Sequence, residues 1–76
     1  MPSSQHSERY RRFCALLVES RKKRGLEQAQ VAHWLKKPQS YVSKYETGER
    51  RLDVVEFLEI AEVLGIQPWI LLRRLT

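Results

Sequence analysis

The chain has 76 residues, which limits it to one small domain and leaves no room for the separate cofactor and substrate lobes of an enzyme. Hydrophobic residues make up 42% of the chain and charged residues 30%, a balance that is typical of a folded protein and excludes a disordered one. The formal net charge is +5, and residues 1–52 carry 12 basic and 5 acidic side chains. This basic part indicates either a face that binds a polyanion or a basic surface that is simply solvated.

The sequence also bears on where the protein works. Its one cysteine, Cys14, cannot form an internal disulfide, and no apolar run approaches the ~18 residues that span a bilayer. Residues 1–6 contain no apolar signal-peptide stretch, and we predict that they form a flexible N-terminal arm. We therefore expect a cytoplasmic protein with no membrane segment, in which residues 7–76 form a single domain.

Glycines and prolines divide this domain into five predicted helices and no strand. Gly25, Gly48 and Gly65 each follow an amphipathic segment, where a left-handed residue commonly ends a helix. Pro38 and Pro68 stand where a helix begins, a position that proline tolerates. The sequence therefore predicts an all-α fold, with helices over residues 7–24, 28–35, 38–47, 54–64 and 68–75.

The first predicted helix carries one apolar stripe. Tyr10, Phe13 and Leu17 recur along it at helical spacing, with Cys14 beside them, so Cys14 is expected to be a core thiol. The last turn, residues 21–24, holds four cations, which suit the negative end of the helix dipole.

The second and third predicted helices are joined by two or three residues only. Val31, Ala32 and Leu35 form the inner face of the first of them, and Val42 and Tyr45 form that of the second. Ala32 is small where two crossing helices must approach closely. The pair is a predicted helix-turn-helix over about residues 28–47. Its second helix presents four polar side chains outward, from Gln39, Ser40, Ser43 and Lys44.

These four side chains suit the recognition of bases. Gln39 and Ser43 are four residues apart, as are Ser40 and Lys44, so all four share one surface of a helix. A helix fits the major groove of DNA, which is about 12 Å wide, where glutamine pairs with adenine and lysine with guanine. We interpret the four as base contacts. The alternative is a solvated face, and Ser43 could serve only to leave room for the groove.

The fourth predicted helix begins with a recognisable capping motif, and the fifth carries more apolar residues than one buried face needs. Asp53 and Glu56 form a predicted capping box, flanked by the hydrophobic staple of Leu52 and Phe57. The apolar face of the fourth helix is expected to hold Phe57, Leu58, Ala61 and Leu64. The fifth helix has more apolar surface than one face needs, which indicates either a dimer interface or packing onto the first and fourth helices. The residues of this possible interface are Trp69, Ile70, Leu72 and Leu75.

Other chemistry is weakly supported. His6 and His33 lack partners at metal-ligand spacing, and no catalytic set exceeds chance, so we expect no metal, no cofactor and no enzyme activity. Trp34 is expected to be partly exposed, because Val31 and Leu35 take the core positions beside it. It would either cover the first helix or contact a partner.

From about Phe13 to Ile66, the chain resembles the Cro/repressor-type helix-turn-helix family, often called XRE-like. The matching residues are Arg21, Gly25, Leu26, Gln28, Val31, Ala32, Leu35, the run 39–46, Gly48, Ile60, Ala61, Leu64, Gly65 and Ile66. The resemblance implies a compact, five-helix, lambda-repressor-like domain. It also implies a small transcriptional repressor that binds double-stranded DNA as a homodimer on an inverted-repeat operator. The alternative is an antitoxin or accessory protein-interaction module with the same fold.

The resemblance also assigns roles to individual residues. Besides the four base contacts, it implies an internal ion pair between Arg21 and Glu46. Phosphate contacts would come from Gln28, Tyr41 and Arg50, and we add Lys36, Lys37 and Arg51 as further candidates.

Two departures from the family pattern have structural consequences. The turn reads Lys36, Lys37, Pro38 where the family often has glycine, a hydrophobic residue and serine. Lys36 is therefore expected to adopt a left-handed backbone conformation, at a cost of about 1 kcal/mol. Glu27 replaces the usual serine or threonine cap, which predicts a weaker start to the second helix.

Overall fold

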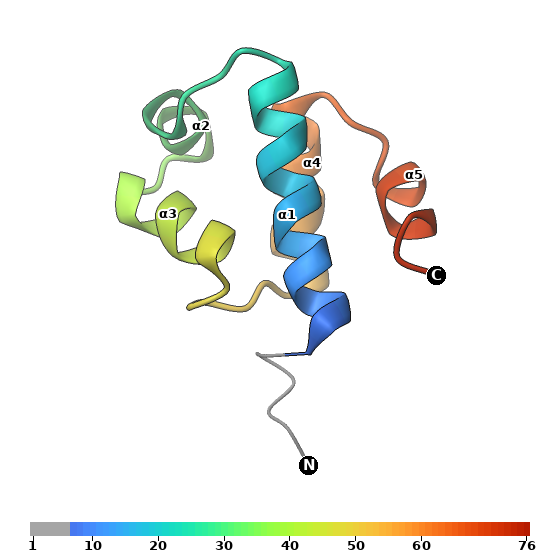
Figure 1. Cartoon of the computed structure of the whole chain (residues 1–76). Coiled ribbons are helices and arrows are strands. Elements are labelled where there is room, and N and C mark those ends of the chain that lie inside the picture. The colour runs from blue at the N-terminus through green and yellow to red at the C-terminus, as the bar shows by residue number, and fades with distance from the viewer. Residues whose placement is uncertain (1–6) are drawn as a thin grey trace.

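The computed structural model describes residues 7–76, so the predicted arm and His6 lie outside the described residues. The described part of the chain consists of five α-helices without a strand, which confirms the predicted fold class (Figure 1). No helix within it is long and apolar enough to cross a membrane. The helices are α1 (Glu8–Lys23), α2 (Gln28–Leu35), α3 (Gln39–Thr47), α4 (Val54–Leu64) and α5 (Pro68–Arg73).

The ends of these helices follow from their capping residues. Ser7 caps α1, where its hydroxyl accepts a hydrogen bond from the Tyr10 N–H (3.1 Å). At the start of α4, Asp53 Oδ1 accepts from the Glu56 N–H (2.8 Å) and Glu56 Oε1 accepts from the Asp53 N–H (3.0 Å), which confirms the capping box. The prediction for α3 was one residue too long, because Pro38 has an extended backbone and stands before the first turn.

The fifth helix is shorter than its predicted span of 68–75. It ends at Arg73, after which the Leu75 N–H donates to the Leu72 carbonyl (3.0 Å) in a tighter, three-residue turn. Gln67 stands at its N-cap without a side-chain cap hydrogen bond.

In the turn between α2 and α3, Lys36 adopts the left-handed conformation that a glycine often adopts at this position. Lys36 has φ 59° and ψ 42°, and it is the only non-glycine residue among 7–76 with a positive φ. Its conformation lets the Lys37 N–H donate to the Ala32 carbonyl (3.0 Å), which closes the C-terminus of α2. The prediction for Lys36 is confirmed.

One hydrophobic core joins the helices. In Figure 1, α1 and α4 form the centre, α2 and α3 lie on one side of them, and α5 lies on the other. The rings of Phe13 and Phe57 meet edge to face, with centroids 5.2 Å apart, and join α1 to α4. Cys14 is also buried, as predicted. The core residues with no exposed surface are Leu17, Val31, Val42, Ile60, Ala61 and Leu64.

The inner face of α4 was partly mispredicted. Leu58 was expected in the core but is exposed, and Ile60 takes a fully buried place instead. The helical turn puts Phe57, Ile60, Ala61 and Leu64 on one stripe, which leaves Leu58 outside it.

Candidate nucleic-acid interface

Helix α3 is anchored by one face and exposed on the other. Tyr41, Val42 and Tyr45 are buried and fix the helix against the domain. The four predicted base-contact residues lie on the remaining surface: Gln39, Ser40 and Lys44 are exposed, and Ser43 is half-buried. The structure therefore brings these four side chains together on one accessible helix face.

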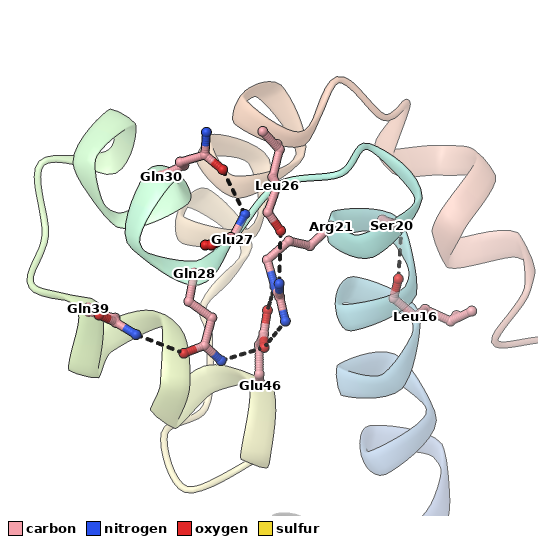
Figure 2. Close-up of polar contacts among 9 residues, drawn as sticks. All are labelled: Leu16, Ser20, Arg21, Leu26, Glu27, Gln28, Gln30, Gln39 and Glu46. Atoms are coloured by element: carbon pink, nitrogen blue, oxygen red, sulfur yellow. Dashed lines mark hydrogen bonds and ion pairs between the residues drawn. The ribbon is translucent and has the colours of Figure 1, made fainter.

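A mostly buried ion pair holds α3 to α1. Arg21 Nε donates to Glu46 Oε2 (2.7 Å) and Arg21 Nη2 donates to Glu46 Oε1 (3.1 Å), while Nη1 donates to the Leu26 carbonyl (2.9 Å) (Figure 2). Only 11% of the Arg21 side chain and 5% of the Glu46 side chain are exposed. The hydrogen bonds to Glu46 raise the pKa of Arg21, so the guanidinium stays charged. Glu46 is therefore neutralised internally, although it belongs to the helix that carries the polar face.

Two hydrogen bonds connect the Glu46 carboxylate, through the side-chain amide of Gln28, to Gln39 on the exposed face of α3. Gln28 Nε2 donates to Glu46 Oε1 (2.8 Å), and Gln39 Nε2 donates to Gln28 Oε1 (3.4 Å) (Figure 2). Gln28 was predicted at a phosphate, and the structure places it half-buried at the first residue of α2. One N–H of its amide has no acceptor among residues 7–76 and remains available. The start of α2 is supported by Gln30 Oε1, which accepts from the Glu27 N–H (2.9 Å).

Two cationic side chains make cation–π contacts with the ring of Tyr41. Its ring is mostly buried, which raises the pKa of the phenol, with the acidic side chain of Glu56 as the next contribution. Arg50 Cζ lies 4.8 Å from the centroid of this ring, and Lys37 Nζ lies 5.4 Å from it. The structure thus places three of the predicted phosphate-contact residues in one cluster.

The remaining predicted phosphate contacts lie on either side of that cluster. Lys36 is exposed in the turn before α3. Arg51 follows α3, and its guanidinium stacks 4.1 Å over the ring of Tyr10. The Tyr10 hydroxyl accepts from the Leu52 N–H (3.1 Å), so the loop after α3 is fixed to the start of α1.

Sequence reasoning missed two polar contacts, one beside Tyr41 and one between the ends of α1 and α4. Arg50 forms a two-pronged ion pair with Glu56, with contacts of 3.1 and 2.8 Å. Arg24 was assigned only to the helix dipole, but its Nη1 also donates to the Leu64 carbonyl (3.1 Å) at the end of α4. The capping box had already accounted for Glu56, and no spacing rule connects Arg24 with a residue 40 positions away.

A second exposed surface lies on α4 and α5. Trp69 is 60% exposed, Ile70 48% and Leu72 44%, so the alternative that all of α5 packs back onto the domain is wrong for these three. Leu71 alone is fully packed in the core, and Leu75 is half-buried. The sequence analysis missed that α4 also carries exposed apolar side chains, at Val54, Val55 and Leu58.

A groove of about 380 Å³ runs along this surface. Phe13 and Phe57 contribute to it from the core. Leu58 lines it from α4, Leu72 from α5 and Leu75 from the turn after α5. We use the name α4/α5 surface for the exposed or half-buried apolar side chains that line this groove: Val54, Leu58, Leu72 and Leu75. Ile70 borders a separate hollow with Glu19 and Arg24.

Trp34 lies apart from both surfaces and is 52% exposed, as expected. It borders a shallow hollow with Lys36 and Lys37 from the turn and Glu59, Glu62 and Val63 from α4. Within residues 7–76 there is no group of histidine, cysteine or acidic side chains that could hold a metal ion.

Together, the fold and the exposed face of α3 define a DNA-binding helix-turn-helix domain. A helix-turn-helix family model matches residues 17–68. An XRE-family like protein from Pseudomonas syringae pv. tomato str. DC3000 is 44% identical, with a TM-score of 0.87, covering 92% of this chain and 85% of that chain. The restriction-modification controller protein C.AhdI from Aeromonas hydrophila is 35% identical, with a TM-score of 0.73, covering 79% of this chain and 91% of that chain. No curated protein sequence matches. The chain belongs to the XRE family of helix-turn-helix proteins, whose members bind DNA and regulate transcription.

Proposed function

We propose that this protein is a sequence-specific transcriptional repressor in the cytoplasm, which inserts α3 into the major groove of double-stranded DNA. The observation that carries the proposal is the division of α3 into two faces. One face is buried through Tyr41, Val42 and Tyr45, and the other is accessible through Gln39 and Lys44. A rigid helix with free polar side chains is what direct readout of base edges requires.

Gln39 is the best-oriented of the proposed base contacts. Its Nε2 already donates to Gln28 Oε1 in a long hydrogen bond (3.4 Å), which favours one orientation of the amide before DNA arrives. Its carbonyl oxygen and second N–H remain available for the two hydrogen bonds that glutamine makes to adenine. Lys44 is exposed five residues further along the helix, where it can donate to guanine, and Ser40 and Ser43 complete the face.

Phosphate contacts on both sides of α3 would fix the position of the helix. Gln28 at the N-terminus of α2 lies on one side, where backbone N–H groups favour an anion. Arg50 and Arg51 lie on the other, and Lys36 and Lys37 precede the helix. These contacts carry no sequence information but supply salt-dependent affinity.

We further propose that two copies associate through the α4/α5 surface. This surface holds large exposed apolar side chains, which are uncommon as a group on a small monomeric protein. A two-fold pair would present two α3 helices to half-sites about 34 Å apart on an inverted-repeat operator. The similarity to a restriction-modification controller protein supports a regulatory role.

The test is selection of bound duplexes from a random pool, with the number of protein chains per selected duplex measured by analytical ultracentrifugation. A symmetric motif with two chains bound is the expected result. A second function, that of a protein-interaction module such as an antitoxin, is favoured by the exposed Trp34 outside both surfaces. If the purified chain bound no duplex even at low salt, this second function would replace the first.

A further inference from the structure

Arg50 is restrained more tightly than an exposed arginine normally is. Its Nη1 donates to the Arg51 carbonyl (3.1 Å) and to Glu56 Oε1 (3.1 Å), and its Nη2 donates to Glu56 Oε2 (2.8 Å). The guanidinium also lies against the ring of Tyr41. Its position is therefore fixed by two elements, α3 beneath it and α4 beside it.

These contacts leave one edge of the guanidinium free. The group has five N–H donors in a plane, and Nη1 and Nη2 use three of them on Glu56 and Arg51. The Nε–H and the second N–H of Nη2 point the same way, and neither has an acceptor within residues 7–76. This is the edge on which a phosphate can accept two parallel hydrogen bonds.

Glu56 is itself held in place by the helix that it begins. Its Oε1 accepts from the Asp53 N–H as well as from Arg50. The bond from Arg50, followed by that from Asp53, lowers the pKa of Glu56, so the carboxylate is charged at neutral pH. The Glu56 carboxylate thus belongs both to the capping box of α4 and to the ion pair that restrains Arg50, which we call the Arg50 clamp.

We infer that Glu56 is a positioning residue for the DNA interface. It holds the Arg50 guanidinium over the Tyr41 ring, so that the free edge of the guanidinium is already oriented when it meets a backbone phosphate. This inference rests on the proposed function. A free arginine side chain loses much rotamer freedom on binding, and a clamp removes that loss in advance. The opposite possibility is that Glu56 competes with the phosphate for Arg50.

Two matched variants separate these possibilities. Glu56→Gln and Asp53→Asn each remove one negative charge from the same capping box, and asparagine caps a helix as well as aspartate does. Only Glu56 contacts Arg50. Each variant is made with Arg50 intact and with Arg50→Ala, and circular dichroism melting is used to set a temperature at which all are folded. Affinity for the selected duplex and for a scrambled duplex is then measured across a salt series.

With Arg50 intact, we expect Glu56→Gln to bind both duplexes about threefold to tenfold more weakly than Asp53→Asn. Its salt slope should also be shallower by about 0.9, the value for one phosphate contact. With Arg50→Ala, the two variants should bind equally. The inference is overturned if Glu56→Gln binds as tightly as Asp53→Asn or more tightly, or if its defect persists without Arg50. Failure of the wild-type protein to bind any duplex would instead overturn the proposed function, and the inference with it.

Discussion

Arg21 of α1 and Glu46 of α3 form a side-on ion pair across 25 residues of sequence, with Nε only 2.7 Å from Oε2. Because both side chains are nearly buried, neither can be solvated if the other is removed. Gln28 donates to the same carboxylate, so the pair fixes α1, α2 and α3 together. The orientation of the exposed face of α3 therefore depends on the Arg21–Glu46 ion pair, although neither of these two residues is a proposed DNA contact.

Removing one member of this pair should be severely destabilising. We expect Arg21→Met to lower the free energy of unfolding by about 3–5 kcal/mol, because the mostly buried Glu46 carboxylate is left without a counter-charge and keeps only the hydrogen bond from Gln28. A domain of this size has little more than that in total. Urea unfolding followed by circular dichroism measures the loss, and Lys22→Met, at the exposed neighbouring position, is the control. Equal stability of the two variants would contradict the account of this pair.

The hydroxyl of Tyr45 should contribute nothing to stability. It is fully buried and has no hydrogen-bond partner among the described residues, and burial strongly raises the pKa of this phenol. Tyr45→Phe should therefore leave the free energy of unfolding unchanged or raise it by about 1 kcal/mol. Tyr10→Phe is the control, since the Tyr10 hydroxyl accepts from the Leu52 N–H, and it should lower stability by about 1 kcal/mol. A loss at Tyr45 as large as that at Tyr10 would show that its hydroxyl is bonded in solution.

Two glycines with the same backbone angle should differ in their tolerance of alanine. Gly25 and Gly65 both have φ +69°, but a Cβ at Gly25 meets open space, whereas one at Gly65 meets the Arg24 guanidinium. We expect Gly25→Ala to cost about 1 kcal/mol for the left-handed backbone. Gly65→Ala should cost roughly 1 kcal/mol more, because Arg24 is displaced from the Leu64 carbonyl.

The same pair of glycine variants can be tested without Arg24. In an Arg24→Ala background, Gly25→Ala and Gly65→Ala should lower the melting temperature equally. If the excess loss at Gly65 remained, a contact other than the one with Arg24 would be responsible.

The α4/α5 surface should lose its ability to associate when charge is placed on it. Leu72→Glu removes an apolar contact of the proposed dimer and introduces a carboxylate that would be buried without a partner. Sedimentation equilibrium should show a dimer for the wild-type protein and a monomer for this variant. Trp34→Glu alters an equally exposed side chain outside the surface and should remain dimeric. A monomeric wild-type protein, or a dimer that survives Leu72→Glu, would contradict the proposed interface.

Much of the fold could be predicted because its signals are local. Asp53, the glycines and the spacing of apolar residues act within a few positions, so helices and caps were placed to within one or two residues over most of the chain. Lys36 was also predictable, since a tight turn without glycine forces some other residue into left-handed φ.

The candidate site was predictable only as a set of positions. The exposure of Gln39 and Lys44 follows from helical spacing. The clamp on Arg50 and the bond from Gln39 to Gln28 depend on how separate helices meet, which no spacing in the chain encodes. The exposure of Leu58 was missed for a different reason: Leu58 was assigned to the core for its hydrophobicity, although the helical spacing of Phe57, Ile60 and Leu64 leaves it outside their stripe.

The central claim is that α3 reads base sequence, and Gln39→Ala tests it most directly because the substitution leaves the charge unchanged. Affinity is measured for the selected duplex and for a scrambled duplex of equal length, with Gln67→Ala as a control at an exposed glutamine distant from α3. The account predicts that Gln39→Ala loses about 1–3 kcal/mol of binding free energy on the selected duplex and almost none on the scrambled one. An equal loss on both duplexes, or no loss on either, would contradict it.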